Sequence, residues 1–149
     1  MDILVKVSGD LIHEEKFYDW LSSIINHPDG LFILCGGGSE ITEAFKRKNI
    51  PYEFGPCGRE IKSEEGRRLA WKILELQEQH VWHVLQKKGI KANILLPVLV
   101  TMESKIFHVN GDNYAIALYP NFDKIYIATL KGRTKSFPEN LNKLEVVYL

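Results

Sequence analysis

Three consecutive glycines, Gly36, Gly37 and Gly38, stand between an apolar stretch and a segment with helical spacing. Glycines in that position let the backbone approach a ligand closely, and the N–H groups of the new helix then favour an anion such as phosphate or carboxylate. The P-loop pattern is absent because no Lys-Ser/Thr pair follows, and a dinucleotide fingerprint would need glycine where Ile41 stands. A tight structural turn explains the glycines equally well, so both interpretations stay open.

A lysine, Lys6, stands near the end of the apolar segment 2–7, just before Ser8-Gly9. Lysine is rarely buried without a partner. In a parallel sheet, loops that leave the carboxyl ends of adjacent strands converge on one crevice, which would bring Lys6 beside the triple glycine. Lys6 could neutralise an anion there. Taken alone, it is more simply interpreted as a strand-end lysine that reaches solvent.

Other candidates lie farther along the chain. Asp112 stands in the first turn of an expected helix, where an acid needs no function to explain it. Arg59 could clamp a carboxylate or could be a solvated loop residue. His80 and His83 lie one helical turn apart, but no further ligand clearly completes a metal site, so we expect no metal and favour an interface role.

The elements that would position these residues alternate between strand and helix. Apolar runs predict strands near 2–7, 31–35, 93–99 (interrupted by Pro97), 124–129 and 146–149, and an extended piece at 106–109. Helical spacing predicts helices over 14–25 (ending at the turn signals of 26–30), 39–48, 63–88 and 111–118, with 49–62 irregular. This order predicts an α/β three-layer sandwich with a mainly parallel sheet.

The 149 residues suit one domain, and 19 basic against 19 acidic side chains exclude the basic footprint of a nucleic-acid-binding protein. A hydrophobic content of 45% excludes disorder. No apolar run approaches the roughly 18 residues of a membrane span, and no secretory signal is evident, so we expect a cytoplasmic protein. Cys35 and Cys57 are too few for a disulfide framework.

The expected helix 63–88 carries two apolar rows. Ser63 is a suitable N-cap and Gly89 a suitable stop. One row contains Leu69, Ile73, Leu76 and Val84, and the other contains Ala70, Leu74, Val81 and Leu85. Two apolar rows indicate two burial partners, which are the sheet and either a neighbouring subunit or another helix. We therefore expect a homodimer through helix 63–88.

In chain order, several segments resemble the amino acid kinase family, which includes acetylglutamate kinases. Lys6-Val7-Ser8-Gly9-Asp10 resembles the opening Lys-x-Gly-Gly-Ser loop, and Gly36-Gly37-Gly38 resembles the Gly-Gly-Gly loop. Gly58-Arg59-Glu60-Ile61 is similar to the segment whose arginine holds the substrate carboxylate, and Asn110-Gly111-Asp112 is similar to an Asn-x-Asp segment. Residues 122–129 resemble the strand that the family ends in Thr-Asp-Val.

The resemblance implies a role for each matched residue. Lys6 would stabilise charge on a transferring phosphoryl group, and Gly9 with Gly36, Gly37 and Gly38 would cradle it. Arg59 and Asn110 would hold the small acceptor, and Asp112 would orient lysines by ion pairing. ATP and Mg²⁺ would be the cofactors, and such chemistry is positioning plus electrostatics.

The chain also departs from the family. Members are commonly longer, with a second half that holds the nucleotide and a further lysine. The resemblance therefore implies that residues 1–149 form a single, truncated amino acid kinase-like domain, the substrate half of the family fold. No second lysine is recognisable, Ser8 replaces glycine, and Asp10 would repel a phosphate unless a metal intervenes. We expect binding of a small anionic metabolite, a dimeric assembly role, or both, without independent phosphotransfer. The alternative is an ATP-dependent kinase of a small carboxylate or amino acid derivative, completed by a partner chain or oligomer.

Overall fold

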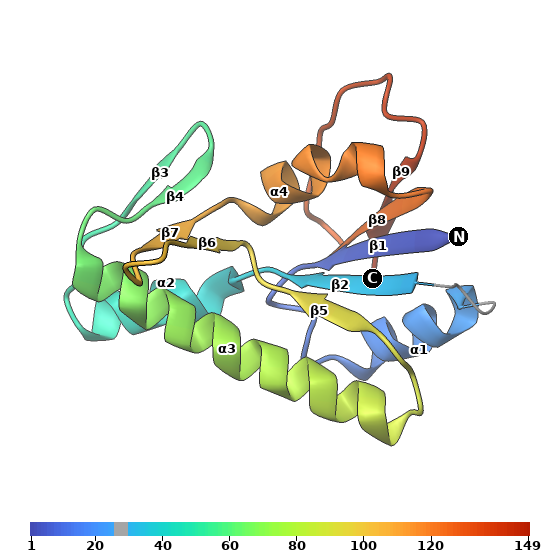
Figure 1. Cartoon of the computed structure of the whole chain (residues 1–149), viewed down its shortest axis with the longest axis horizontal. Coiled ribbons are helices and arrows are strands. Elements are labelled where there is room, and N and C mark those ends of the chain that lie inside the picture. Colours follow the sequence, from blue (N-terminus) through green and yellow to red (C-terminus); the bar gives the residue numbers. More distant parts are fainter. Residues whose placement is uncertain (26–29) are drawn as a thin grey trace.

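A five-stranded sheet forms the centre of the molecule in the computed structural model, which describes residues 1–25 and 30–149 (Figure 1). Its order is β5-β2-β1-β8-β9, and all four pairings are parallel. The strands are β1 (Asp2–Val7), β2 (Gly30–Cys35), β5 (Asn93–Leu95), β8 (Lys124–Thr129) and β9 (Leu144–Tyr148). The sheet is flanked by helices, which confirms the predicted α/β sandwich.

Helices cover both faces of this sheet. Figure 1 shows α1 (Glu15–Ile24) and α3 (Glu64–Lys87) on one side and α4 (Gly111–Ala117) on the other. Because strand side chains alternate between faces, Val5 and Val7 belong to the core with α1 and α3, and Leu4 belongs to the core with α4. Burial on both faces explains why the parallel strands are apolar runs rather than alternating patterns.

A third apolar cluster joins α2 (Gly38–Arg47) to the first half of α3. The predicted boundaries of α3 are confirmed. The side chain of Ser63 accepts a hydrogen bond from the Gly66 N–H at 3.0 Å, and Gly89 has a φ of +68°, which suits a residue that ends a helix. The predicted turn signals at 26–29 lie outside the described residues.

Two segments differ from the prediction. The single strand expected over 93–99 is two strands, because only β5 joins the central sheet while β6 (Val98–Val100) pairs antiparallel with β7 (Ile106–His108). Pro97 separates them, since proline offers no N–H and restricts the residue before it.

The second difference is a hairpin in the stretch expected to be irregular. It consists of β3 (Glu53–Gly55) and β4 (Gly58–Glu60), and Gly58 in its turn has a φ of +100°. Strand β9 begins two residues earlier than predicted. Among the described residues, no helix is both long and apolar enough to cross a membrane.

The order of the strands reverses at β1. The chain passes from β1 to β2 and β5 on one side, and then crosses back to β8 and β9 on the other. Ligands of open α/β sheets bind beyond the carboxyl ends of the strands at such a reversal. The carboxyl ends of β1, β2 and β8 lie side by side there, with Val7 in register with both Cys35 and Ala128.

Candidate functional site

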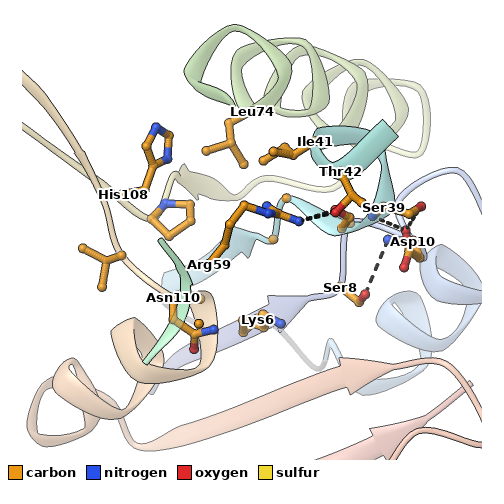
Figure 2. Close-up of a pocket in the computed structure, with 18 of the residues that line it drawn as sticks. Lys6, Ser8, Asp10, Ser39, Ile41, Thr42, Arg59, Leu74, His108 and Asn110 are labelled. Atoms are coloured by element: carbon orange, nitrogen blue, oxygen red, sulfur yellow. Dashed lines mark hydrogen bonds between the residues drawn. The ribbon is translucent and has the colours of Figure 1, made fainter. Parts of the chain in front are cut away.

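A cavity of about 380 Å³ opens at this edge of the sheet (Figure 2). Segments after three neighbouring strands line it, together with β4 and the start of α4. Its lining includes seven of the eight predicted site residues, which are Lys6, Gly9, Gly36, Gly37, Gly38, Arg59 and Asn110. The eighth, Asp112, reaches the cavity through an ion pair with Lys6.

Lys6 is a buried cation on the α4 side of the sheet. It is 7% exposed, and its Nζ lies 2.9 Å from Oδ1 of Asp112. A Cβ at Gly111 would lie 2.9 Å from Cε of Lys6, so the glycine leaves room for the lysine. Burial lowers the pKa of Lys6, and the attraction of Asp112 opposes this shift only in part.

Asp112 lies between two lysines. Nζ of Lys135 donates a hydrogen bond to Oδ2 of Asp112 at 2.6 Å, on the carboxyl oxygen that Lys6 does not approach. Burial would raise the pKa of Asp112, but Lys6 and Lys135 outweigh burial and hold that pKa below its ordinary value. The sequence analysis singles out one lysine for this site, Lys6, and the structure places a second, Lys135, on the same carboxylate.

Asp10 lies at the N-terminus of α2. Its Oδ1 accepts hydrogen bonds from the N–H of Ser39 at 2.9 Å and from Oγ of Ser39 at 2.7 Å, and its Oδ2 contacts Nη2 of Arg133. Arg133 also donates to Oγ of Ser8 at 3.0 Å. Burial would raise the pKa of Asp10, but these partners lower it overall. The N–H of Ser39, at the start of a helix that the sequence predicts to face a ligand, therefore donates to Asp10 instead. Arg133 neutralises the charge of Asp10.

The glycines also hold the two loops together. A Cβ at Gly9 would lie 2.7 Å from backbone atoms of Gly36, Gly37 and Gly38, so the loops after β1 and β2 meet backbone to backbone. Gly38 has a φ of +63°, a conformation that favours glycine. The structural-turn interpretation thus accounts for Gly9 and Gly38, although all four glycines border the cavity.

Arg59 reaches across the cavity from β4, as Figure 2 shows. Its Nη2 donates to the carbonyl of Gly38 at 3.1 Å and to Oγ1 of Thr42 at 2.8 Å. Its buried Nε has no hydrogen-bond partner among the described residues. Burial lowers the pKa of Arg59. The guanidinium is still charged at neutral pH, because the ordinary pKa of arginine is so high that the group stays protonated in proteins. The contacts of Nη2 hold the guanidinium in place beside the loop after β2.

Asn110 and His108 form another part of the lining. Oδ1 of Asn110 accepts the N–H of Asn113 at 3.0 Å and caps α4, while a Cβ at Gly58 would lie 2.6 Å from its Nδ2. His108 shares a 2.8 Å hydrogen bond with the carbonyl of Arg67, so Nε2 carries the proton. Burial lowers the pKa of His108 and favours the neutral ring.

The predicted histidine pair lies away from this cavity. The rings of His80 and His13 are 4.3 Å apart, and Nε2 of His13 lies 2.9 Å from Glu40. Across residues 1–25 and 30–149, no three side chains of His, Cys, Asp or Glu are grouped to hold a metal ion. On α3, Leu76 and Trp82 are exposed.

No protein-family profile matches the chain, and no curated protein matches it. Its structure is similar to the crystal structure of smu.665 from Streptococcus mutans, with a TM-score of 0.67 and 16% sequence identity. The match covers 85% of this chain and 71% of that chain. At this identity the similarity shows a shared α/β fold.

Proposed function

We propose that the cavity binds a small anionic metabolite. The observation that carries this proposal is the convergence of four cationic side chains, Lys6, Arg59, Arg133 and Lys135, on one cavity. Asp10 and Asp112 balance two of these charges, and the remainder is positive. In a partly dry site, an unbalanced positive charge attracts an anion far more strongly than it would in water.

A thermal-shift panel tests this proposal. The probes are inorganic phosphate, pyrophosphate, acetate and N-acetylglutamate, each compared with chloride at equal ionic strength. A ligand at about 100 times its dissociation constant stabilises the folded state by roughly 2.7 kcal/mol, which shifts the melting temperature by several degrees. A shift with at least one oxyanion supports the proposal, and no shift with any of them contradicts it.

Matched variants locate the site. Arg59→Gln removes a cavity cation, whereas Arg68→Gln removes an exposed arginine that pairs with Glu64 on the outer side of α3. We expect the anion-dependent shift to fall in Arg59→Gln and to stay unchanged in Arg68→Gln. Equal shifts in both variants would place binding outside the cavity.

A second candidate is phosphoryl transfer within an amino acid kinase-like domain. The contacts of Lys6 and Lys135 with one carboxylate, Asp112, favour it, because paired lysines suit the charge of a transferring phosphoryl group. Mg²⁺ fits less well, since both oxygens of Asp10 already contact Ser39 or Arg133. Calorimetry with Mg·ATP tests this candidate: tight binding that is lost in Lys6→Ala supports a kinase, and no heat in either protein contradicts phosphoryl transfer from ATP.

The proposal also includes a homodimer in the cytoplasm. Leu76 and Trp82 are 57% and 54% exposed on α3, which supports contact through the predicted helix. Cys35 and Cys57 are free thiols, as a reducing compartment permits. Light scattering tests the dimer: we expect twice the chain mass for the wild type and the single mass for Leu76→Glu, and a monomeric wild type at high concentration contradicts it.

A further inference from the structure

The cavity has a charged side and an apolar side. Figure 2 shows Lys6 and Asn110 on one side of Arg59, and Ile41 and Leu74 on the other. The apolar lining comes from separate segments of the chain and consists of Ile41, Phe54, Ile61, Leu74, Pro97 and Val109. A site for an anion alone would not need an apolar wall of this extent.

The charged side offers donors for one anionic group. Lys6 and Lys135 both contact Asp112, which holds their two ammonium groups close together. Lys6 and Arg59 also approach neighbouring glycines: a Cβ at Gly36 would lie 3.5 Å from Cε of Lys6, and one at Gly37 would lie 3.5 Å from Nη1 of Arg59. These three cations therefore surround one region of the cavity.

A second anionic group on the ligand would find the start of α2 already occupied by the carboxylate of Asp10. The carboxylate of Asp10 already accepts the N–H and the hydroxyl of Ser39 at the start of α2. Its partners hold the pKa of Asp10 below the ordinary value, so it is ionised at neutral pH. A further phosphate placed there would meet this negative charge at short range.

Part of the apolar side belongs to the hydrophobic core. Ile41 and Leu74 are 3% and 1% exposed and belong to the cluster that joins α2 to α3. The ring of Phe54 lies 5.2 Å from the guanidinium carbon of Arg59 and extends the apolar wall toward the opening. The volume of about 380 Å³ falls within the range of pockets that enclose small organic ligands, roughly 300–1,000 Å³.

From these two sides we infer that the ligand is amphipathic: one phosphate or carboxylate group, held by Lys6, Lys135 and Arg59, attached to a short apolar chain that contacts Ile41, Leu74 and Val109. This inference rests on the proposed anion site and specifies its ligand class. It also excludes ligands with two adjacent phosphates, because the carboxylate of Asp10 occupies the place at the start of α2 where a second phosphate would lie.

A homologous series of ligands tests the inference. Dissociation constants are measured by calorimetry for methyl, ethyl, propyl and butyl phosphate, and for acetate through pentanoate. Burial of one methylene contributes about 0.8 kcal/mol, so affinity rises about fourfold for each added methylene. Glycerol 3-phosphate binds more weakly than propyl phosphate, since its hydroxyls lose water against an apolar wall. Pyrophosphate binds no more tightly than inorganic phosphate.

Paired variants show that the apolar wall causes this slope. Val109→Thr replaces a methyl group of a cavity residue by a hydroxyl of similar size, and Val100→Thr makes the same change on the exposed part of β6 outside the cavity. We expect Val109→Thr to weaken butyl phosphate at least threefold while leaving inorganic phosphate unchanged. Val100→Thr changes neither.

Each outcome has a distinct meaning. A slope in the phosphate series, the carboxylate series or both supports the inference and shows which headgroup the site takes. Binding of inorganic phosphate with no slope in either series overturns the inference and leaves the anion site intact. No binding of any probe overturns the proposed function itself.

Discussion

Two carboxylates, Asp10 and Asp112, complete the same cavity and hold their charges in different ways. Their side chains are similarly exposed, at 16% and 18%, but their cationic partners differ: the side chain of Arg133 is 42% exposed, whereas the side chain of Lys6 is 9% exposed. Asp10 also accepts from the backbone of α2, whereas Asp112 contacts two lysines from different segments. We expect the burial of the cationic partner, rather than that of the acid, to decide how much stability each carboxylate contributes.

The largest expected effect is that of Asp112→Ala. Removal of one partner of a buried ion pair leaves the other as an uncompensated charge, here Lys6, and destabilises a protein by about 3 kcal/mol or more. Urea denaturation measures the loss. The double variant Lys6→Met/Asp112→Ala is the control, since it removes the stranded charge and should recover part of the stability. A double variant less stable than the single one would contradict this explanation.

Acid pH should reduce the free energy of unfolding through both carboxylates. The pKa of Asp10 and that of Asp112 lie below their ordinary value of 3.8 in the folded protein. Each group therefore contributes stability that is fully present above about pH 3.8 and is lost as the pH falls through the folded pKa. Urea denaturation from pH 6 to pH 2 should give a flatter profile for Asp112→Asn than for the wild type, and superimposable profiles would contradict it.

Lys6 affects the free energy of unfolding at alkaline rather than acid pH. Its pKa in the folded protein lies below the ordinary 10.5, so the folded state disfavours the charged lysine. This contribution makes stability rise with pH between the lowered pKa and 10.5, because the unfolded chain then binds the extra proton. Lys6→Met should remove that rise when stability is measured over the alkaline range, and its persistence in Lys6→Met would assign it to another group.

Asp10→Ala should have a smaller effect than Asp112→Ala. Loss of a side-chain acceptor at a helix N-terminus destabilises a protein by about 1 kcal/mol, and the freed Ser39 N–H lies at the cavity, where water can reach it. Urea denaturation of the two alanine variants side by side tests the comparison. Equal losses would show that the burial of the partner does not decide the effect.

The smallest expected effect is that of Arg133→Gln. Its ion pair with Asp10 is 42% exposed on the arginine side, and exposed pairs contribute between about 0 and 1 kcal/mol. Stability should change little in urea, whereas anion affinity should fall because a cavity cation is lost. A loss of stability as large as that of Asp112→Ala would remove the distinction between the two carboxylates.

The sequence predicts most of the strands and helices that position this site. Fully apolar runs such as 31–35 identify strands that are buried on both faces, and Ser63 and Gly89 mark the ends of α3 by local chemistry. The position of Lys6 beside the triple glycine follows from the parallel order of β1 and β2. These features depend on neighbours in sequence or on one rule of topology.

Other features depend on contacts that no local pattern contains. Arg133 and Lys135 follow β8 in a charged segment typical of a solvated loop, and they reach the cavity because β8 pairs with β1. From the sequence, Asp10 is interpreted as a charge that repels a phosphate. Its contact with Ser39 spans 29 residues, so no local pattern predicts it. Pro97 marks an interruption of the expected strand already in the sequence, since proline rarely lies inside a central strand, but the antiparallel pairing of β6 with β7 has no such local signal.

Calorimetric titration with inorganic phosphate is the decisive test of an anion site in this cavity. We expect one site per chain in the wild type, at least tenfold weaker binding in Arg59→Gln and in Lys135→Gln, and unchanged binding in Arg68→Gln, with each variant's fold checked by circular dichroism. Equal affinities in the wild type and all three variants, or no heat of binding in the wild type, would contradict an anion site at the carboxyl ends of β1, β2 and β8.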